Sequence, residues 1–208
     1  MYDKYFKKEK GITGLETAII LIAFVVVAAV FAYTALSAGL FSTQKAQEAV
    51  YSGLKEAQST LELKGAVIAT GNVTGDSGKI GEITFTVSNV LGGEPVDFTP
   101  PSTGSGGIAG GNSHKVVINY LDSQQEVDNL YWSVNKMGND DGDNLLETGE
   151  KFQITVGSQS GEGNLFDALT DNLTVNRTFS LIIMTPIGAV LTIERTTPPY
   201  IDKIMNLR

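Results

Sequence analysis

The acidic segment 139–150 holds the residues whose types and spacing are best suited to binding a cation. Within these twelve positions, oxygen-bearing side chains stand at positions one, three, five, nine and twelve, namely Asn139, Asp141, Asp143, Glu147 and Glu150. Loops that wrap Ca²⁺ supply oxygen ligands at this spacing. Asn144 occupies position six, where such loops have glycine, but asparagine tolerates a left-handed backbone. We therefore predict a Ca²⁺-binding loop on a β scaffold, and the alternative is a solvated acidic hairpin that binds no ion.

Glu16 is the second residue whose chemistry needs an explanation, because it opens the longest uncharged stretch of the chain. Between Glu16 and Lys45 no side chain is charged. An ionised carboxylate in lipid is costly unless it is paired. Glu16 therefore either meets a cationic partner or stays at the lipid headgroups as an acid in the first turn of a helix.

Three Asn-X-Thr sequences could accept N-linked glycans. They begin at Asn72, Asn172 and Asn176. Asn172 and Asn176 are four positions apart, so on a strand they would share one face. Such short motifs also arise by chance, but each lies at or beside the end of a predicted strand, and we expect a glycosylated surface.

Residues for catalysis are scarce. The sequence has no cysteine and a single histidine, His114, which we interpret as a solvent-facing residue at the start of a strand. The glycine-rich segment 104–111 lacks the strand–loop–helix context of a phosphate-binding loop. We therefore expect a protein that is not an enzyme and has no catalytic cofactor.

The N-terminal segment must position Glu16. Residues 1–11 form a basic leader with four lysines and two acids. A secretory signal is cleaved after its apolar stretch, but here the only plausible cleavage site precedes that stretch, so the apolar segment would remain in the mature protein. Residues 12–61 contain no proline and predict one helix about 75 Å long, at about 1.5 Å per residue. A bilayer needs only about 20 residues, and the helix continues beyond that length with an apolar stripe at helical spacing: Ala46, Val50, Leu54, Ala57 and Leu61.

Residues 62–208 consist of short β-rich runs separated by turns. Ile83, Phe85 and Val87 alternate as in a half-buried strand. The expected strands are 63–72, 80–90, 114–121, 130–135, 151–156, 173–184 and 189–195. Seven such strands predict a Greek-key sandwich of immunoglobulin type, with a loop at 92–111 and a tail at 200–208 that is helical or frayed. The predicted fold class is α+β, a long N-terminal hydrophobic helix followed by an all-β domain.

The leader, the junction and the helix together resemble the archaellins, the archaeal flagellins built on the plan of type IV pilins. The resemblance is carried by Lys10-Gly11, by Glu16 and by the apolar run from Ala18 to Val30. It is looser over the rest of the chain. It implies that a membrane-bound prepilin-type peptidase cuts between Gly11 and Ile12. It also implies that Glu16 pairs with the free amine of Ile12 in a neighbouring subunit.

The leading hypothesis is a structural subunit of the archaellum, the swimming filament of archaea. By this resemblance, the subunit is inserted in the membrane as a precursor and then assembled at the cell surface into a homopolymer or a mixed filament. A formal charge of −8 suits an extracellular surface, and it argues against nucleic acid, which binds proteins through Lys and Arg.

Two alternatives remain open. The first is an archaeal adhesion pilin with the same processing. The second is a membrane-anchored monomer whose β domain binds calcium or sugar. An apolar stripe that continues past the membrane length argues against the monomer.

Overall fold

The computed structural model describes residues 14–58, 61–90, 93–158, 163–187 and 190–207. Residue contacts divide the chain into an N-terminal unit that ends at Tyr51 and a compact unit that begins at Ser52. The predicted cleavage site, Gly11 and Ile12, lies outside the described residues.

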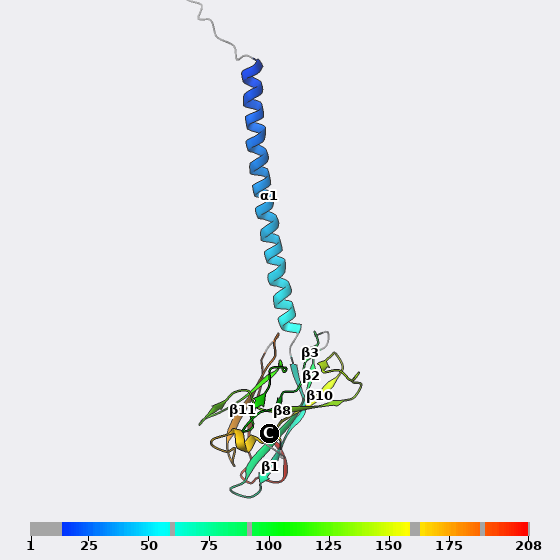
Figure 1. Ribbon diagram of the computed structural model, residues 1–208, viewed down its shortest axis with the longest axis vertical. Helices are drawn as coiled ribbons and strands as arrows, with labels where there is room; N and C mark the ends of the chain where they lie inside the picture. The colour runs from blue at the N-terminus through cyan, green and yellow to red at the C-terminus, as the bar shows by residue number, and fades with distance from the viewer. Residues whose placement is uncertain (1–13, 59–60, 91–92, 159–162, 188–189, 208) are drawn as a thin grey trace, which may run out of the picture. The chain divides into compact units, whose positions relative to one another are not determined.

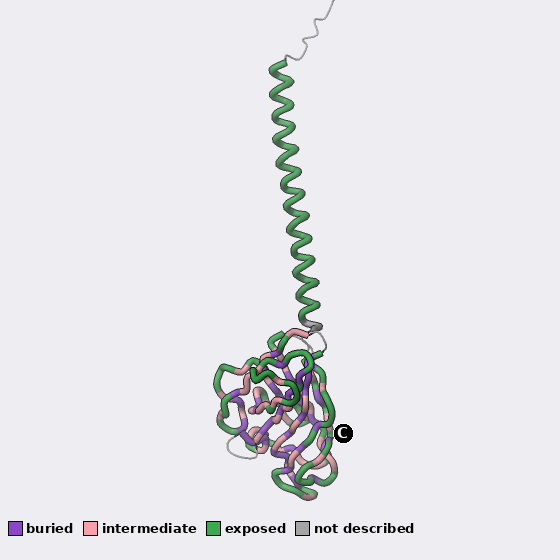
Figure 2. Tube along the Cα trace, turned by 90° about the vertical axis from the view of Figure 1, so that its right-hand side faces the viewer, coloured by how far each residue is buried: buried purple, intermediate pink, exposed green. Residues whose placement is uncertain are grey.

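Helix α1 spans Gly14–Gln58 with 45 residues. It makes up the described part of the N-terminal unit, and its last turns, from Ser52 on, belong to the compact unit. Glu16 lies in its first turn and Lys55 in its last turn, as the helix dipole favours. Every side chain from Gly14 to Lys55 is exposed, as the continuous green tube in Figure 2 shows. The helix ends before Leu61, which is only 4% exposed and begins strand β1. The predicted apolar stripe therefore extended too far, because its last member belongs to the core of the β domain.

The β domain is built from two main antiparallel sheets (Figure 1). The five-stranded sheet has the order β13 (Ile204–Leu207), β1 (Leu61–Val73), β2 (Lys79–Asn89), β10 (Lys151–Gly157) and β8 (Trp132–Met137). The four-stranded sheet has the order β12 (Leu191–Thr196), β11 (Thr178–Met184), β6 (Val117–Asp122) and β7 (Glu126–Val127). Three minor elements complete the domain: the pair β3 (Val96–Asp97) with β9 (Leu145–Leu146), the pair β4 (Ser102–Thr103) with β5 (Ala109–Gly110), and the short helix α2 (Leu165–Ala168).

The strand order confirms the predicted fold class. In one sheet β1-β2-β10-β8 follow the order A-B-E-D of an immunoglobulin-type domain, and in the other β12-β11-β6-β7 follow G-F-C-C′. Strand β13 is an addition beside β1. The inward residues of both sheets form one core, in which Phe98 packs edge-on against Trp132 and Phe152 with ring centroids 5.9 and 6.0 Å apart. All three rings are fully buried.

The C-terminal tail corrects one prediction. We expected residues 200–208 to be helical or frayed, but β13 pairs with β1. Ahead of β13, Ile201 is fully buried, and its backbone exchanges hydrogen bonds of 2.9 and 3.1 Å with Gly75. A Cβ atom at Gly78 would lie 2.4 Å from Cβ of Ile201, so the close approach of the tail requires glycine there.

Two further strand predictions need correction. The strand predicted at 173–184 begins only at Thr178, because the preceding residues form a turn in which Asn176 has φ of 52°. The segment predicted as a plain loop at 92–111 contains β3, β4 and β5, each of two residues.

Candidate functional site

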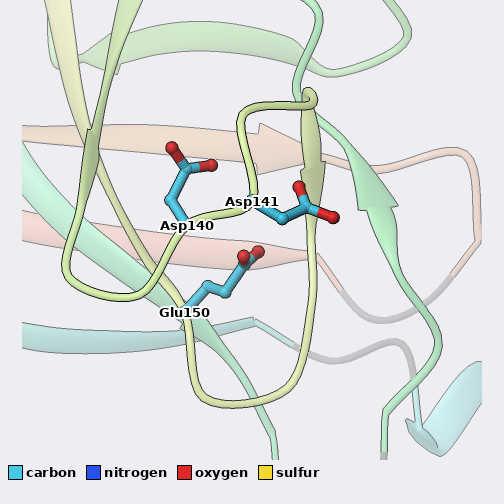
Figure 3. Close-up of side chains that lie close together, drawn as sticks. All are labelled: Asp140, Asp141 and Glu150. Atoms are coloured by element: carbon cyan, nitrogen blue, oxygen red, sulfur yellow. The ribbon is translucent and has the colours of Figure 1, made fainter.

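Three carboxylates converge in the acidic segment. Asp140 and Asp141 come from the chain between β8 and β9, and Glu150 directly precedes β10. One carboxylate oxygen of each residue lies within 4.8 Å of the others, and Figure 3 shows the side chain of Glu150 directed toward the two aspartates.

Local hydrogen bonds position these three side chains. Asp140 Oδ1 accepts a hydrogen bond from the N–H of Gly142 at 3.2 Å, and Asp141 Oδ1 accepts one from the N–H of Asp143 at 3.1 Å. Such contacts two residues along the chain are typical of Asx turns. Glu150 is only 6% exposed, and its Oε2 accepts a hydrogen bond from the N–H of Glu147 at 2.9 Å. The loop therefore folds around a buried carboxylate.

The structure groups the acidic residues differently from the twelve-residue pattern. Asp141 and Glu150 of the predicted set belong to the group, whereas Asp143 and Glu147 do not. Asp143 Oδ1 instead accepts a hydrogen bond from the N–H of Leu145 at 2.7 Å. Asn139 is exposed in the same loop. The twelve-residue pattern did not identify Asp140 as a candidate ligand, because Asp140 stands at position two, where the pattern has no ligand. The only hint in the sequence was its place next to Asp141.

Carboxylate oxygens are hard donors, and a set of two aspartates and one glutamate suits Ca²⁺ or Mg²⁺. The set contains neither sulfur nor imidazole, so it does not suit the softer transition metals. The donor chemistry therefore fits the predicted cation.

A second polar cluster joins the loop before β11 to strand β6. The side chain of Asp122 is fully buried and accepts hydrogen bonds from the Tyr120 hydroxyl at 2.7 Å and from two backbone N–H groups of the following turn. Arg177 contacts Asp122 at 3.4 Å and Asp171 at 2.6 Å. Burial alone would raise the pKa of Asp122, but the hydrogen bonds and the guanidinium together lower it below its ordinary value. Burial and the bond to Asp122 raise the pKa of Tyr120. The cluster therefore holds an ionised carboxylate inside the fold.

The three predicted glycan acceptors have different surroundings. Asn72 is exposed in β1, and Asn176 is exposed at its turn. Asn172 is half-buried, and its Oδ1 is buried without a hydrogen-bond partner among the described residues. The expected common strand face of Asn172 and Asn176 does not exist, because both residues precede β11.

His114 also differs from the prediction. It precedes β6 rather than lying in it, and it is half-buried, with Nε2 3.0 Å from Oδ1 of Asn129. The imidazole of His114 therefore contacts the side-chain amide of Asn129, and this contact gives the histidine a structural role.

The β domain has its own core, whereas α1 exposes its apolar side chains along its whole described length to Lys55. By length and composition, Gly14–Lys55 could cross a membrane. These features define a class of protein: a subunit whose helix must be covered by lipid or by other copies.

The chain belongs to the archaeal-type flagellin family, whose model matches residues 11–195. It is 39% identical to probable flagellin 1 of Archaeoglobus fulgidus over 98% of each chain. It is 40% identical to probable flagellin 2 of that organism, over 94% of this chain and 93% of the relative. It is also similar to the solved archaeal flagellum of Methanospirillum hungatei strain JF1, with a TM-score of 0.63 and 28% identity over 94% of this chain and 98% of that one.

The protein is therefore a structural subunit of the archaellum and is extracellular in the filament. Its family is one of filament proteins and not of enzymes. Of the hypotheses drawn from the sequence, the archaellum subunit is the one that these relatives support.

Proposed function

We propose that the mature subunit begins at Ile12 and polymerises with further copies through α1. The observation that supports this proposal is the uncovered apolar helix. Ile20, Leu21 and Phe24 are 61, 61 and 78% exposed, and farther along Val50 and Tyr51 are still 68 and 69% exposed. A bilayer core spans only about 20 helical residues. Lipid can cover the first half of the helix in the precursor, but the second half needs protein partners.

Glu16 has a role in this assembly. It lies in the first turn of α1, close to the N-terminus that cleavage after Gly11 would create. Within an apolar filament core, the carboxylate of Glu16 would pair with the new amine of Ile12 in the neighbouring copy. A partner charge that is left unpaired in such an environment costs about 3–5 kcal/mol. Cleavage after Gly11 would require a prepilin-type peptidase as the processing partner, acting on a precursor that α1 holds in the membrane.

Two experiments test this proposal. Mass spectrometry of purified filaments should find Ile12 as the N-terminal residue, and an intact Met1 would contradict the processing. The Glu16→Gln variant should insert in the membrane but yield few filaments, whereas Glu48→Gln, an exposed helix position outside the first turn, should assemble normally. Normal filament number and length in Glu16→Gln would refute the pairing role.

We further propose that the acidic loop binds Ca²⁺ through Asp140, Asp141 and Glu150. Three convergent oxygen donors and the buried position of Glu150 support this assignment. The ion would join the two ends of the loop and stabilise the β domain. Bound Ca²⁺ has a structural role here and takes no part in a reaction.

A further inference from the structure

The two main sheets turn chemically different outer faces to solvent, on opposite sides of the sandwich. We call the outward side of the five-stranded sheet face 1. Strand registers place an uncharged row across it: Ser133, Thr155, Thr84, Ile68 and Asn206. The Thr84 and Thr155 hydroxyls are 3.2 Å apart. Ile68 is 37% exposed, and Ile204, one row away, is 67% exposed.

Face 1 carries few charges. Two acids and two bases stand at outward positions in the registered part of its strands: Glu62, Glu82, Lys64 and Lys151. Lys79, at the start of β2, has its Nζ 4.7 Å from the centroid of the Phe166 ring. Lys64 is paired with Glu62 at 2.7 Å. Lys151 is exposed and has no ion-pair partner among the described residues. Face 1 is therefore low in charge, and Lys151 is available to meet an acid of another copy.

We call the outward side of the four-stranded sheet face 2. At its centre Ile182 of β11 stands between Thr192 of β12 and Asn119 of β6. Three further apolar residues lie next to this row along the strands, namely Val117, Met184 and Leu121, the last being 40% exposed. The outward positions of these strands carry two acids, Glu126 and Glu194, and no base. Face 2 therefore presents an uncharged, partly apolar centre with a negative margin.

Most of the described acidic residues of the β domain lie in loops, outside the centres of these two faces. With a formal charge of −8, copies of the chain repel one another unless they meet through surfaces of low or opposite charge. Juxtaposed like charges are costly at an interface. Face 1 and face 2 are low in charge, and the lysine of one complements the acids of the other.

We propose that face 1 of one copy packs against face 2 of the next copy in the filament. This inference rests on the proposed assembly and adds the contact made by the β domains. A contact between two different surfaces of identical subunits is heterologous, and it generates an open polymer when the rotation does not close. An isologous contact of face 1 with face 1 would instead produce closed pairs.

The absence of cysteine in the sequence permits a direct test. The full chain would be produced in an archaeal host that lacks its own archaellins, with Thr84→Cys and Ile182→Cys introduced together. Treatment of intact filaments with a short bis-maleimide should give a ladder of covalent oligomers. A variant with only one of the two cysteines should give no covalent oligomers, because the same face of two copies does not meet. A control variant with Thr84→Cys and Asp76→Cys, the latter in an exposed turn, should also stay monomeric.

The outcomes separate this inference from the assembly proposal. Covalent dimers from Thr84→Cys alone would overturn the heterologous contact in favour of an isologous one. Filaments of the double variant without a ladder would overturn any contact between the two faces. A wild-type chain that forms no filaments would contradict the proposed function itself.

Charge reversal gives a second measurement should the cysteine variants fail to assemble. Lys151→Glu and Glu194→Lys should each reduce the number of filaments per cell roughly tenfold, the effect of about 1.4 kcal/mol per contact. The chain that carries both changes should recover, because each interface then again joins opposite charges. Asp76→Lys, which changes the net charge as Glu194→Lys does, should assemble normally. Single variants that assemble like wild type, or a double variant no better than the worse single one, would overturn the inference.

Discussion

Replacing Asp141 by Asn should remove most of the Ca²⁺-dependent stabilisation of the β domain, whereas replacing Asp143 by Asn should not. The twelve-residue pattern treats both aspartates as ligands. The structure groups only Asp141 with Asp140 and Glu150. This pair of variants therefore distinguishes the geometry of the folded loop from the spacing in the sequence.

The expected magnitude follows from the distances. The three carboxylates have oxygens within 4.8 Å of one another. Two unit charges about 4 Å apart in water repel by about 1 kcal/mol, so three pairs cost roughly 2–3 kcal/mol when no cation is bound. An ion that binds only the folded state stabilises it by about 2.7 kcal/mol at a hundredfold excess over the dissociation constant. For a domain of this size that corresponds to a rise in melting temperature of roughly 5–10 °C.

The assay is thermal unfolding of residues 52–208, followed by circular dichroism in Ca²⁺ and in chelator at equal ionic strength. The wild type and Asp143→Asn should melt higher in Ca²⁺, and Asp141→Asn should melt at nearly the same temperature in both. Asp141→Asn should also melt higher than wild type in chelator, because one member of the repelling group is neutral. Equal melting of the wild type in both solutions would refute the site. Loss of the Ca²⁺ effect in Asp143→Asn as well would refute the three-residue grouping.

Three further outcomes can be measured on the same domain or on filaments. Mass spectrometry of filaments should find a glycan that is lost in Asn176→Gln but no change in Asn172→Gln, because the Asn172 side-chain oxygen is buried; a glycan on Asn172 would contradict this. Ile201→Ala should lower the free energy of unfolding by about 2–5 kcal/mol in urea titrations, whereas Tyr200→Ala, at a site 49% exposed, should change it by no more than about 0.5 kcal/mol. Because the folded-state pKa of Asp122 lies below 3.8, its stabilising contribution is complete above that pH and is lost as the pH falls through the folded-state pKa. The melting temperature of wild type should therefore fall more steeply between about pH 4 and pH 2 than that of Asp122→Asn, and parallel curves would refute the role of that carboxylate.

The strands that could be predicted from the sequence are those in which an alternation of apolar and polar residues indicates which side chains are buried. Ile83, Phe85 and Val87 alternate with threonines, and all three are buried in β2. Strand β13 has no such signal, since it has only four residues and its stability comes from pairing with β1, far away in the sequence. The helix boundary was misplaced for a related reason. Leu61 continues the helical spacing of Val50 and Leu54, and spacing alone does not show that a leucine is buried by a different element.

The acidic loop shows why residue types could be predicted from the sequence while their grouping could not. The twelve-residue spacing of a calcium loop brings its ligands together when the loop lies between two helices. Here the loop joins two paired strands. Met137 of β8 lies opposite Lys151 of β10, so the two ends of the loop are held together. Asp140 and Asp141, close to one end, therefore reach Glu150 at the other. Asp143 and the residues beyond it lead into β9, which pairs with β3, and this second pairing draws the middle of the loop away from the carboxylate group.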